Sequence, residues 1–199
     1  MSCFEHTMLV LDCSAVENDP VVSFACLCHD LGKRVTYHLY SNLHGHEEAG
    51  VPAITALCEQ YRVPTEYRNA AIMAALYHTK IHNIYELRPT TIVDLLDKIG
   101  AFHSRTNLNR LLSVCLYDSK GRGEPVCNDE YNNHLYVNAL VDYLSTLDTK
   151  EIAKAAMDSG KRGPLVGNSI RQARIAMIKK FKTDNIGKYK DTNEKRRHT

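Results

Sequence analysis

The sequence contains no Trp, and no apolar run approaches the ~20 residues that a membrane-spanning helix needs. The N-terminal segment from Met1 to His6 lacks the basic region and the apolar stretch of a signal peptide. The formal net charge is only +2, so composition gives no reason to expect a bulk polyanion as partner. We therefore expect a cytoplasmic protein with no membrane partner.

The sequence also lacks the cysteine pattern of a disulfide framework. Its seven Cys are an odd number, and several lie within apolar helical runs, which indicates buried free thiols in a reducing compartment. Cys26 and Cys28 stand two positions apart, so on a helix their side chains point about 200° apart. We therefore expect them to pack rather than to bind one metal ion.

No convincing alternating pattern of a β-strand occurs, and the apolar periodicity is helical almost throughout. We expect an all-α bundle of about eight to nine helices within one domain, residues 1–182. The polar segment 34–42 is expected to be a loop, and residues 183–199 a basic, disordered tail. The predicted helices cover residues 7–16, 20–32, 47–61, 64–82, 89–99, 107–117, 131–147, 150–157 and 165–181.

The strongest local signal for chemistry is an adjacent His29 and Asp30 at the C-terminal end of the apolar second helix. An imidazole nitrogen beside a carboxylate oxygen suits a borderline divalent ion. Gly32 is expected to end this helix in a left-handed conformation, which would leave Lys33 outside it to meet a phosphate oxygen. A His-Asp pair is common, however, and by itself it also fits a structural role.

Two further residues are expected to join this pair. His6 begins the preceding helix, and a short link makes the two helices antiparallel, so His6 and His29 fall at the same end of the hairpin. Asp118 ends a helix, where the macrodipole disfavours a carboxylate by ~0.3–1 kcal/mol, and this placement suggests a role as ligand. Lys120 and Arg122 follow it and could hold a phosphate. The alternative for His6 is an exposed terminal residue.

Four other histidines are candidates for the same region. His44 and His46 precede the helix at 47–61, and His78 and His82 stand four residues apart, so they share one helix face. His46 and His78 are the better candidates for ligands or phosphate donors, and His82 could instead be a surface residue at a helix end. The remaining histidines, His38, His103, His134 and His198, are read as surface residues.

His6, His29-Asp30 and Asp118, in this order on helices, resemble the H…HD…D signature of the HD phosphohydrolase superfamily. The match extends over about residues 4–182, where several segments resemble the C-terminal HD domain of bacterial multifunctional CCA-adding enzymes. In that family a nucleotidyltransferase head and a tRNA-binding neck precede the domain. This chain shows neither, so CCA addition is not expected. The segments that carry the resemblance are 24–33, 44–50, 61–64, 89–97 and 165–181.

The resemblance implies metal-dependent hydrolysis of 2′,3′-cyclic phosphates, 2′-nucleotides and small phosphomonoesters, with a nucleotide or an RNA end as substrate. It implies His6, His29, Asp30 and Asp118 as metal ligands, with Asp30 also accepting a proton from water. The cofactor would be Ni, Mn, Co, Zn or Fe, with Mg as a further candidate, as one ion or two. Extra histidines would hold the second ion, and a homodimer would be in keeping with the family.

Three alternatives remain at this point. The chain could hydrolyse a cyclic dinucleotide or oligonucleotide signal, or it could be a non-enzymatic module that binds nucleotides. The least favoured alternative is a tRNA-binding accessory protein that acts through its basic tail.

Overall fold

The computed structural model describes residues 1–122 and 131–194, and within these ranges it is all-helical. The prediction of an all-α fold is therefore confirmed. None of the described helices combines the length and the apolar character needed to cross a membrane. The described helices are α1 (Cys3–Ser14), a 3₁₀ turn η1 (Ala15–Glu17), α2 (Pro20–Cys28), α3 (Leu31–Tyr40), α4 (His46–Gln60), α5 (Thr65–His82), α6 (Pro89–Ile99), α7 (Thr106–Lys120), α8 (Asn132–Ser145), α9 (Thr149–Asp158) and α10 (Pro164–Glu194).

The first helix starts earlier than the apolar pattern predicts. Ser2 accepts a hydrogen bond from the backbone N–H of Glu5, and the Glu5 carboxylate accepts one from the Ser2 backbone. This capping box starts α1 at Cys3, and it places His6 inside the helix, where its side chain is buried.

The prediction of a loop at residues 34–42 is wrong, because α3 occupies Leu31–Tyr40. Its buried residues are Gly32 and Thr36, which carry no apolar signal. Gly32 lies within the helix and does not terminate α2. A Cβ atom at Gly32 would stand 1.8 Å from the carbonyl oxygen of His46, so the residue is needed for the close packing of α3 against α4.

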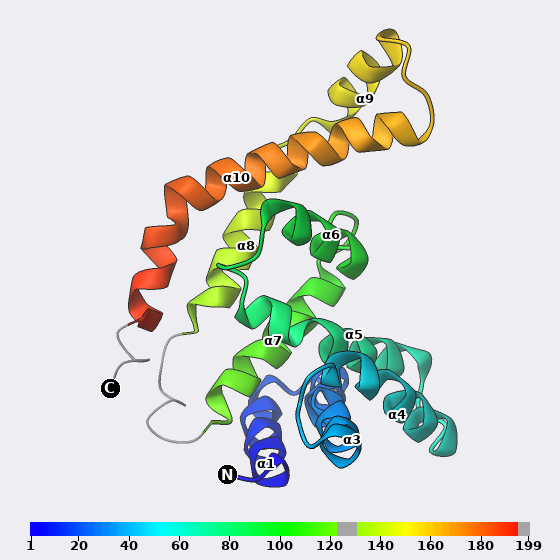
Figure 1. Ribbon diagram of the computed structural model, residues 1–199, viewed down its shortest axis with the longest axis vertical. Coiled ribbons are helices and arrows are strands. Elements are labelled where there is room, and N and C mark those ends of the chain that lie inside the picture. The colour runs from blue at the N-terminus through cyan, green and yellow to red at the C-terminus, as the bar shows by residue number, and fades with distance from the viewer. Residues whose placement is uncertain (123–130, 195–199) are drawn as a thin grey trace.

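Three apolar cores hold the described helices together (Figure 1). Helices α1, α2, α5 and α7 share one small core, α2, α4 and α5 share another, and a larger core joins α5, α6, α7, α8 and α10. In Figure 1, α9 and the adjoining part of α10 extend away from this body. The described cysteines are free, and Cys26, Cys28, Cys58 and Cys115 are buried, as predicted; Cys127 lies outside the described residues.

Helix α10 continues beyond residue 182, where the sequence places the start of a tail, to Glu194. The ring of Tyr189 packs against Tyr136 of α8, with 5.6 Å between ring centroids. Lys182 donates hydrogen bonds to the carbonyls of Tyr85 and Leu87. This part of the chain is therefore packed on the body, whereas the end of the predicted tail lies outside the described residues.

Candidate metal centre

The helix packing brings six helix ends to one place. His6 lies in the first turn of α1 and Asp118 in the last turn of α7. His29 caps the end of α2, and Asp30 directly precedes α3. These four residues are buried and form the first part of a polar cluster, to which α4 and α5 add the histidines described below.

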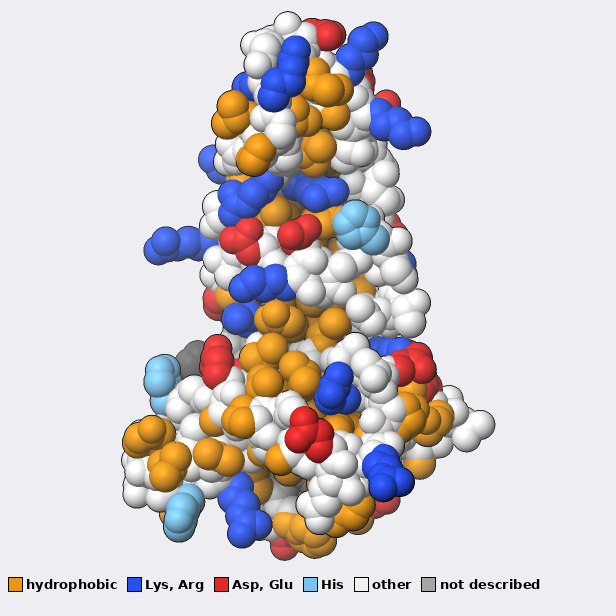
Figure 2. All heavy atoms as spheres, turned by 90° about the vertical axis from the view of Figure 1, so that its right-hand side faces the viewer, with side chains coloured by type: hydrophobic (Ala, Val, Ile, Leu, Met, Phe, Trp, Pro, Cys, Tyr) orange, Lys and Arg blue, Asp and Glu red, His pale blue; other side chains and the backbone are white. Residues whose placement is uncertain are grey.

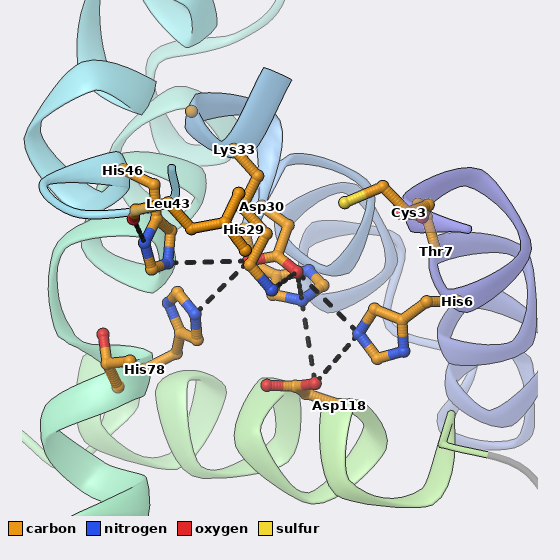
Figure 3. A network of polar contacts seen from close by, with 12 residues as sticks. Cys3, His6, Thr7, His29, Asp30, Lys33, Leu43, His46, His78 and Asp118 are labelled. Atoms are coloured by element: carbon orange, nitrogen blue, oxygen red, sulfur yellow. Dashed lines mark hydrogen bonds and ion pairs between the residues drawn. The ribbon is translucent and has the colours of Figure 1, made fainter. Parts of the chain in front are cut away.

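The four residues predicted as ligands lie within reach of one another. His6 Nε2 is 3.0 Å from Asp118 Oδ1 and 3.9 Å from Asp30 Oδ2. His29 Nε2 is 3.3 Å from Asp30 Oδ2 and 3.8 Å from Asp118 Oδ1. Figure 3 shows these side chains pointing toward one another from different helices. The donor atoms of His6, His29 and Asp30 all lie within 4.8 Å of one another, a spacing that one ion could bridge.

A second group uses the other oxygen of Asp30. His78 Nε2 is 3.5 Å from Asp30 Oδ1, and His46 Nε2 is 3.8 Å from it. Both imidazoles are buried, and with Asp30 they form another set whose donor atoms lie within 4.8 Å of one another. Asp30 therefore stands between two sets of imidazole nitrogens, with one carboxylate oxygen facing each set (Figure 3).

Backbone carbonyls fix the orientation of these rings. The Nδ1 atoms of His6, His29, His46 and His78 lie 3.1, 2.7, 2.9 and 2.9 Å from the carbonyl oxygens of Gly121, Cys26, Leu43 and Ala74, respectively. A carbonyl can only accept, so each Nδ1 carries a hydrogen and donates it. In the neutral ring the lone pair is then on Nε2, which is the nitrogen that faces the carboxylates. This arrangement matches the outer-shell pattern by which proteins orient metal-ligating histidines.

Three buried polar atoms in this cluster have no hydrogen-bond partner within the described part of the chain: His29 Nε2, Asp30 Oδ1 and His46 Nε2. Buried polar groups are nearly always paired, so three unpaired atoms in one cluster need an explanation. A divalent cation held with His6 and His29 would engage His29 Nε2, and one held with His46 and His78 would engage His46 Nε2 and Asp30 Oδ1. The residues present therefore fit a metal ion, and their mixture of nitrogen and oxygen donors fits a borderline one.

The electrostatics of the cluster favour ionised carboxylates. Burial alone would raise the pKa of Asp30, but its polar contacts with His29 and His78 outweigh burial and hold the pKa well below the usual range. For Asp118, burial is likewise outweighed by hydrogen bonds from His6 and His82, and its pKa is lowered. Both carboxylates are therefore charged near neutral pH and available as ligands.

The same contacts raise the pKa values of two of the histidines, His6 and His29. The hydrogen bond to Asp118 raises the pKa of His6, against the effect of burial. Burial acts to lower the pKa of His29, but its contacts with Asp30 and Asp118 outweigh that effect and the pKa is raised. Without a cation, protons therefore tend to occupy the positions that face the carboxylates.

The sequence suggested that His82 could be a surface residue at a helix end, but its side chain is largely buried against Asp118. Its side chain is 15% exposed, and its Nε2 lies 2.7 Å from Asp118 Oδ2. Its Nδ1 lies 2.8 Å from the hydroxyl of Tyr131, which precedes α8. Since Nε2 donates to a carboxylate, Nδ1 accepts from the tyrosine in the neutral ring. Burial lowers the pKa of His82, so this neutral form is favoured.

The sequence gives no sign that Tyr131 belongs to the site. Its partner His82 lies on another helix, and Asp118 lies 13 residues upstream, so no local motif connects the three. The sequence also gives no sign of the role of Gly121, whose carbonyl accepts from His6. A Cβ atom at Gly121 would lie 2.3 Å from Val10 Cγ2 and 2.9 Å from the Val10 nitrogen. The glycine therefore lets α1 approach the end of α7.

A cavity of about 370 Å³ opens onto this cluster. Lys33 and Arg122 line it, and Lys33 Nζ is 2.5 Å from Asp30 Oδ2. Lys120 is half-buried and is not among the described residues that line this cavity. His44 is exposed, and its imidazole lies outside both candidate groups. The other lining residues are Met1, Ser2, Cys3, His6, Leu43, His46, His78, Thr79, His82 and Asp118.

Comparison with known families agrees with this geometry. Residues 4–102 match the model of the HD domain family. The chain belongs to this family, as predicted from the order of its His and Asp residues. HD domains are in general metal-dependent hydrolases, and the His/Asp cluster of this chain could hold a metal ion.

Several individual proteins similar to this chain carry the name Multifunctional CCA protein. The protein from Haemophilus influenzae (strain PittGG) is 31% identical over 189 residues, which cover 91% of this chain and 44% of that protein. The protein from Legionella pneumophila (strain Lens) is 32% identical over 180 residues, 89% of this chain and 42% of that protein. The protein from Acidovorax sp. (strain JS42) is 35% identical over 175 residues, 87% and 41% respectively.

The chain thus spans less than half the length of the curated relatives that it matches. The predicted resemblance to this group is confirmed for the region compared. No solved structure matches the chain significantly.

Proposed function

We propose that this protein is a metal-dependent phosphohydrolase that acts on phosphoesters of nucleotides or RNA ends. The observation that carries the proposal is the shared orientation of four buried imidazoles. Each directs Nδ1 to a backbone carbonyl and Nε2 toward Asp30 or Asp118, and Asp30 keeps a buried oxygen with no hydrogen-bond partner in the described chain. A cluster built only for packing would not need such uniform ring orientations.

The residues suited to hold the principal ion are His6, His29 and Asp30, together with Asp118, which lies beside both imidazoles. His46 and His78 with Asp30 suit a second ion. Mn, Fe, Co, Ni and Zn fit these donors best, with Mg as a further candidate. When bound, such an ion neutralises phosphate oxygens and lowers the pKa of a water molecule.

The protein's own groups would perform the remaining tasks. The carboxylate of Asp30 stays ionised and lies between the two imidazole sets, a position from which it can accept a proton from the attacking water. Lys33 and Arg122 line the cavity and would stabilise negative charge on the phosphate oxygens. As water adds to phosphorus, its proton passes to Asp30 and the bond to the ribose oxygen breaks. That oxygen leaves as a hydroxyl group with the proton that Asp30 accepted.

His82 is better suited to position Asp118 than to bind metal, since its Nε2 already donates to that carboxylate. Tyr131 would hold the ring in this tautomer. The relatives are named Multifunctional CCA protein, and they match this chain over less than half of their length. We therefore include an RNA 3′ end with a 2′,3′-cyclic phosphate among the substrates to test.

The proposal can be tested with a panel of metals and substrates. We expect 2′,3′-cyclic AMP, 2′-AMP, an RNA oligonucleotide that ends in a 2′,3′-cyclic phosphate, or p-nitrophenyl phosphate to be hydrolysed when Mn, Co, Ni, Zn, Fe or Mg is added, and not in the presence of a chelator. Asp30→Asn should reduce kcat by about a hundredfold or more, because the variant removes a ligand and a proton acceptor together. Asp158→Asn, an exposed acid on α9, is the matched control.

Metal binding without hydrolysis of any of these substrates would contradict the proposed activity. If the folded protein binds none of these ions at micromolar concentration, the cluster is not a metal-binding site. If nucleotides bind equally well with and without metal and none is cleaved, the chain is a non-enzymatic nucleotide-binding module.

A further inference from the structure

A second and larger cavity lies beside the metal cluster. Its volume is about 540 Å³, and it lies between α1, the end of α2 and α3. Asp30 forms part of its wall, and three residues, Cys3, Lys33 and Leu43, line both this groove and the cavity over the cluster. The groove and the candidate reaction centre are therefore continuous, and a molecule bound across them would contact both.

The walls of this groove are unlike those of the centre. They are mainly apolar, and several of the large side chains are exposed, notably Phe4 at 73% and Tyr37 at 66%. The remaining apolar residues are Cys3, Met8, Leu27, Leu31 and Leu43. On the face shown in Figure 2, Lys, Arg, Asp and Glu side chains lie between apolar patches.

The charged residues among the described lining residues are few, and two of them, Asp30 and Lys33, adjoin the metal cluster. Lys33 and Arg34 contribute positive charge, and Asp30 is the acid among the described lining residues. A ligand that fits this lining has an anionic group at the cluster and a flat apolar body beside it. The volume of the groove also falls in the range of ~300–1,000 Å³ that is typical of small-molecule sites.

We propose that this groove binds the nucleoside part of the substrate, with its base stacked on Phe4 or Tyr37 while the phosphate lies at the metal cluster. The inference rests on the proposed function for the position of the phosphate. If the groove binds the nucleoside, the enzyme prefers nucleotides to phosphomonoesters without a base. Stacking on aromatic side chains tolerates any base, so the groove selects for the presence of a base more than for its identity.

Steady-state kinetics with two phosphomonoesters test the proposal. At least one of Phe4→Ala and Tyr37→Ala should raise KM for 2′-AMP by about ten- to hundredfold, the range expected for the loss of one stacking contact. KM for β-glycerol phosphate, which has no base, should stay the same. Tyr40→Ala on the same helix is the matched control, because Tyr40 is 67% exposed and does not line the groove.

Direct binding separates this proposal from the proposed hydrolysis. Adenosine, which has no phosphate, should bind the metal-free protein in an NMR titration, and Phe4→Ala or Tyr37→Ala should weaken that binding. If the wild-type protein binds adenosine but cleaves nothing, the groove assignment stands and the catalytic one fails. If both variants leave adenosine binding and the ratio of KM values unchanged, the groove does not hold the nucleoside, whatever the activity.

Discussion

Replacement of Gly32 by Ala tests the packing that brings the two halves of the candidate centre together. The added Cβ would lie 1.8 Å from the carbonyl oxygen of His46 and 2.6 Å from the backbone nitrogen of Gly50. Both atoms belong to the backbone of α4, so no side-chain rotation can relieve the clash. To reach even 3.0 Å from the His46 oxygen, the two helices must separate by about 1.2 Å.

The magnitude follows from the rigidity of these helices. Overpacking a tight interior costs ~1–3 kcal/mol, and a clash between two backbones belongs at the upper end. We expect Gly32→Ala to lower the free energy of unfolding by about 3 kcal/mol, which is more than a hundredfold in the folding equilibrium. For a domain of this size the midpoint of thermal unfolding should fall by about 6–12 °C.

Urea unfolding of the metal-free protein, followed by circular dichroism, measures this effect. Gly167→Ala is the control, because a Cβ at Gly167 in α10 meets nothing within 4 Å. That substitution should stabilise the protein by up to ~1 kcal/mol through helix propensity. Displacement of the start of α4 should also weaken metal binding by the group that includes His46. A Gly32→Ala protein as stable as the wild type would refute the close approach of α3 and α4.

Two further predictions concern the chemistry of the centre. Tyr131→Phe removes the hydroxyl that donates to His82 Nδ1, so metal affinity measured by calorimetry should fall by about tenfold or more, whereas Tyr40→Phe should leave it unchanged. Metal affinity should also rise with pH and level off only above the raised pKa values of His6 and His29, because both rings must lose a proton before they can bind an ion. An affinity that stays constant from pH 5.5 to 8.5 would show that neither ring is a ligand.

The sequence was sufficient to predict the meeting of His6, His29, Asp30 and Asp118. Adjacency supplies two of these residues, and the antiparallel hairpin of the first two helices supplies a third. The unusual position of an Asp at the end of an apolar helix supplies the fourth. These signals are local or depend on one short connection, so they can be read without knowing the packing of distant helices.

The missed features depend on contacts between distant elements. Helix α3 was predicted as a loop because its buried face consists of Gly32 and Thr36, so close backbone approach replaces the apolar periodicity on which the prediction relied. The hydrogen bond from Tyr131 to His82 joins α5 to the start of α8, and no pattern within either segment indicates it. His82 was judged from its place at a helix end, where burial by a neighbouring element cannot be foreseen.

The position of Asp30 bears on how many ions the centre could hold. One of its oxygens faces His6 and His29, and the other faces His46 and His78. A carboxylate used in this way can bridge two ions, each completed by a separate pair of imidazoles. Asp118 serves only the first pair, since its other oxygen accepts from His82. The first position therefore has four candidate ligands and the second has three, so we infer that the first would bind its ion more tightly and would fill first in a titration.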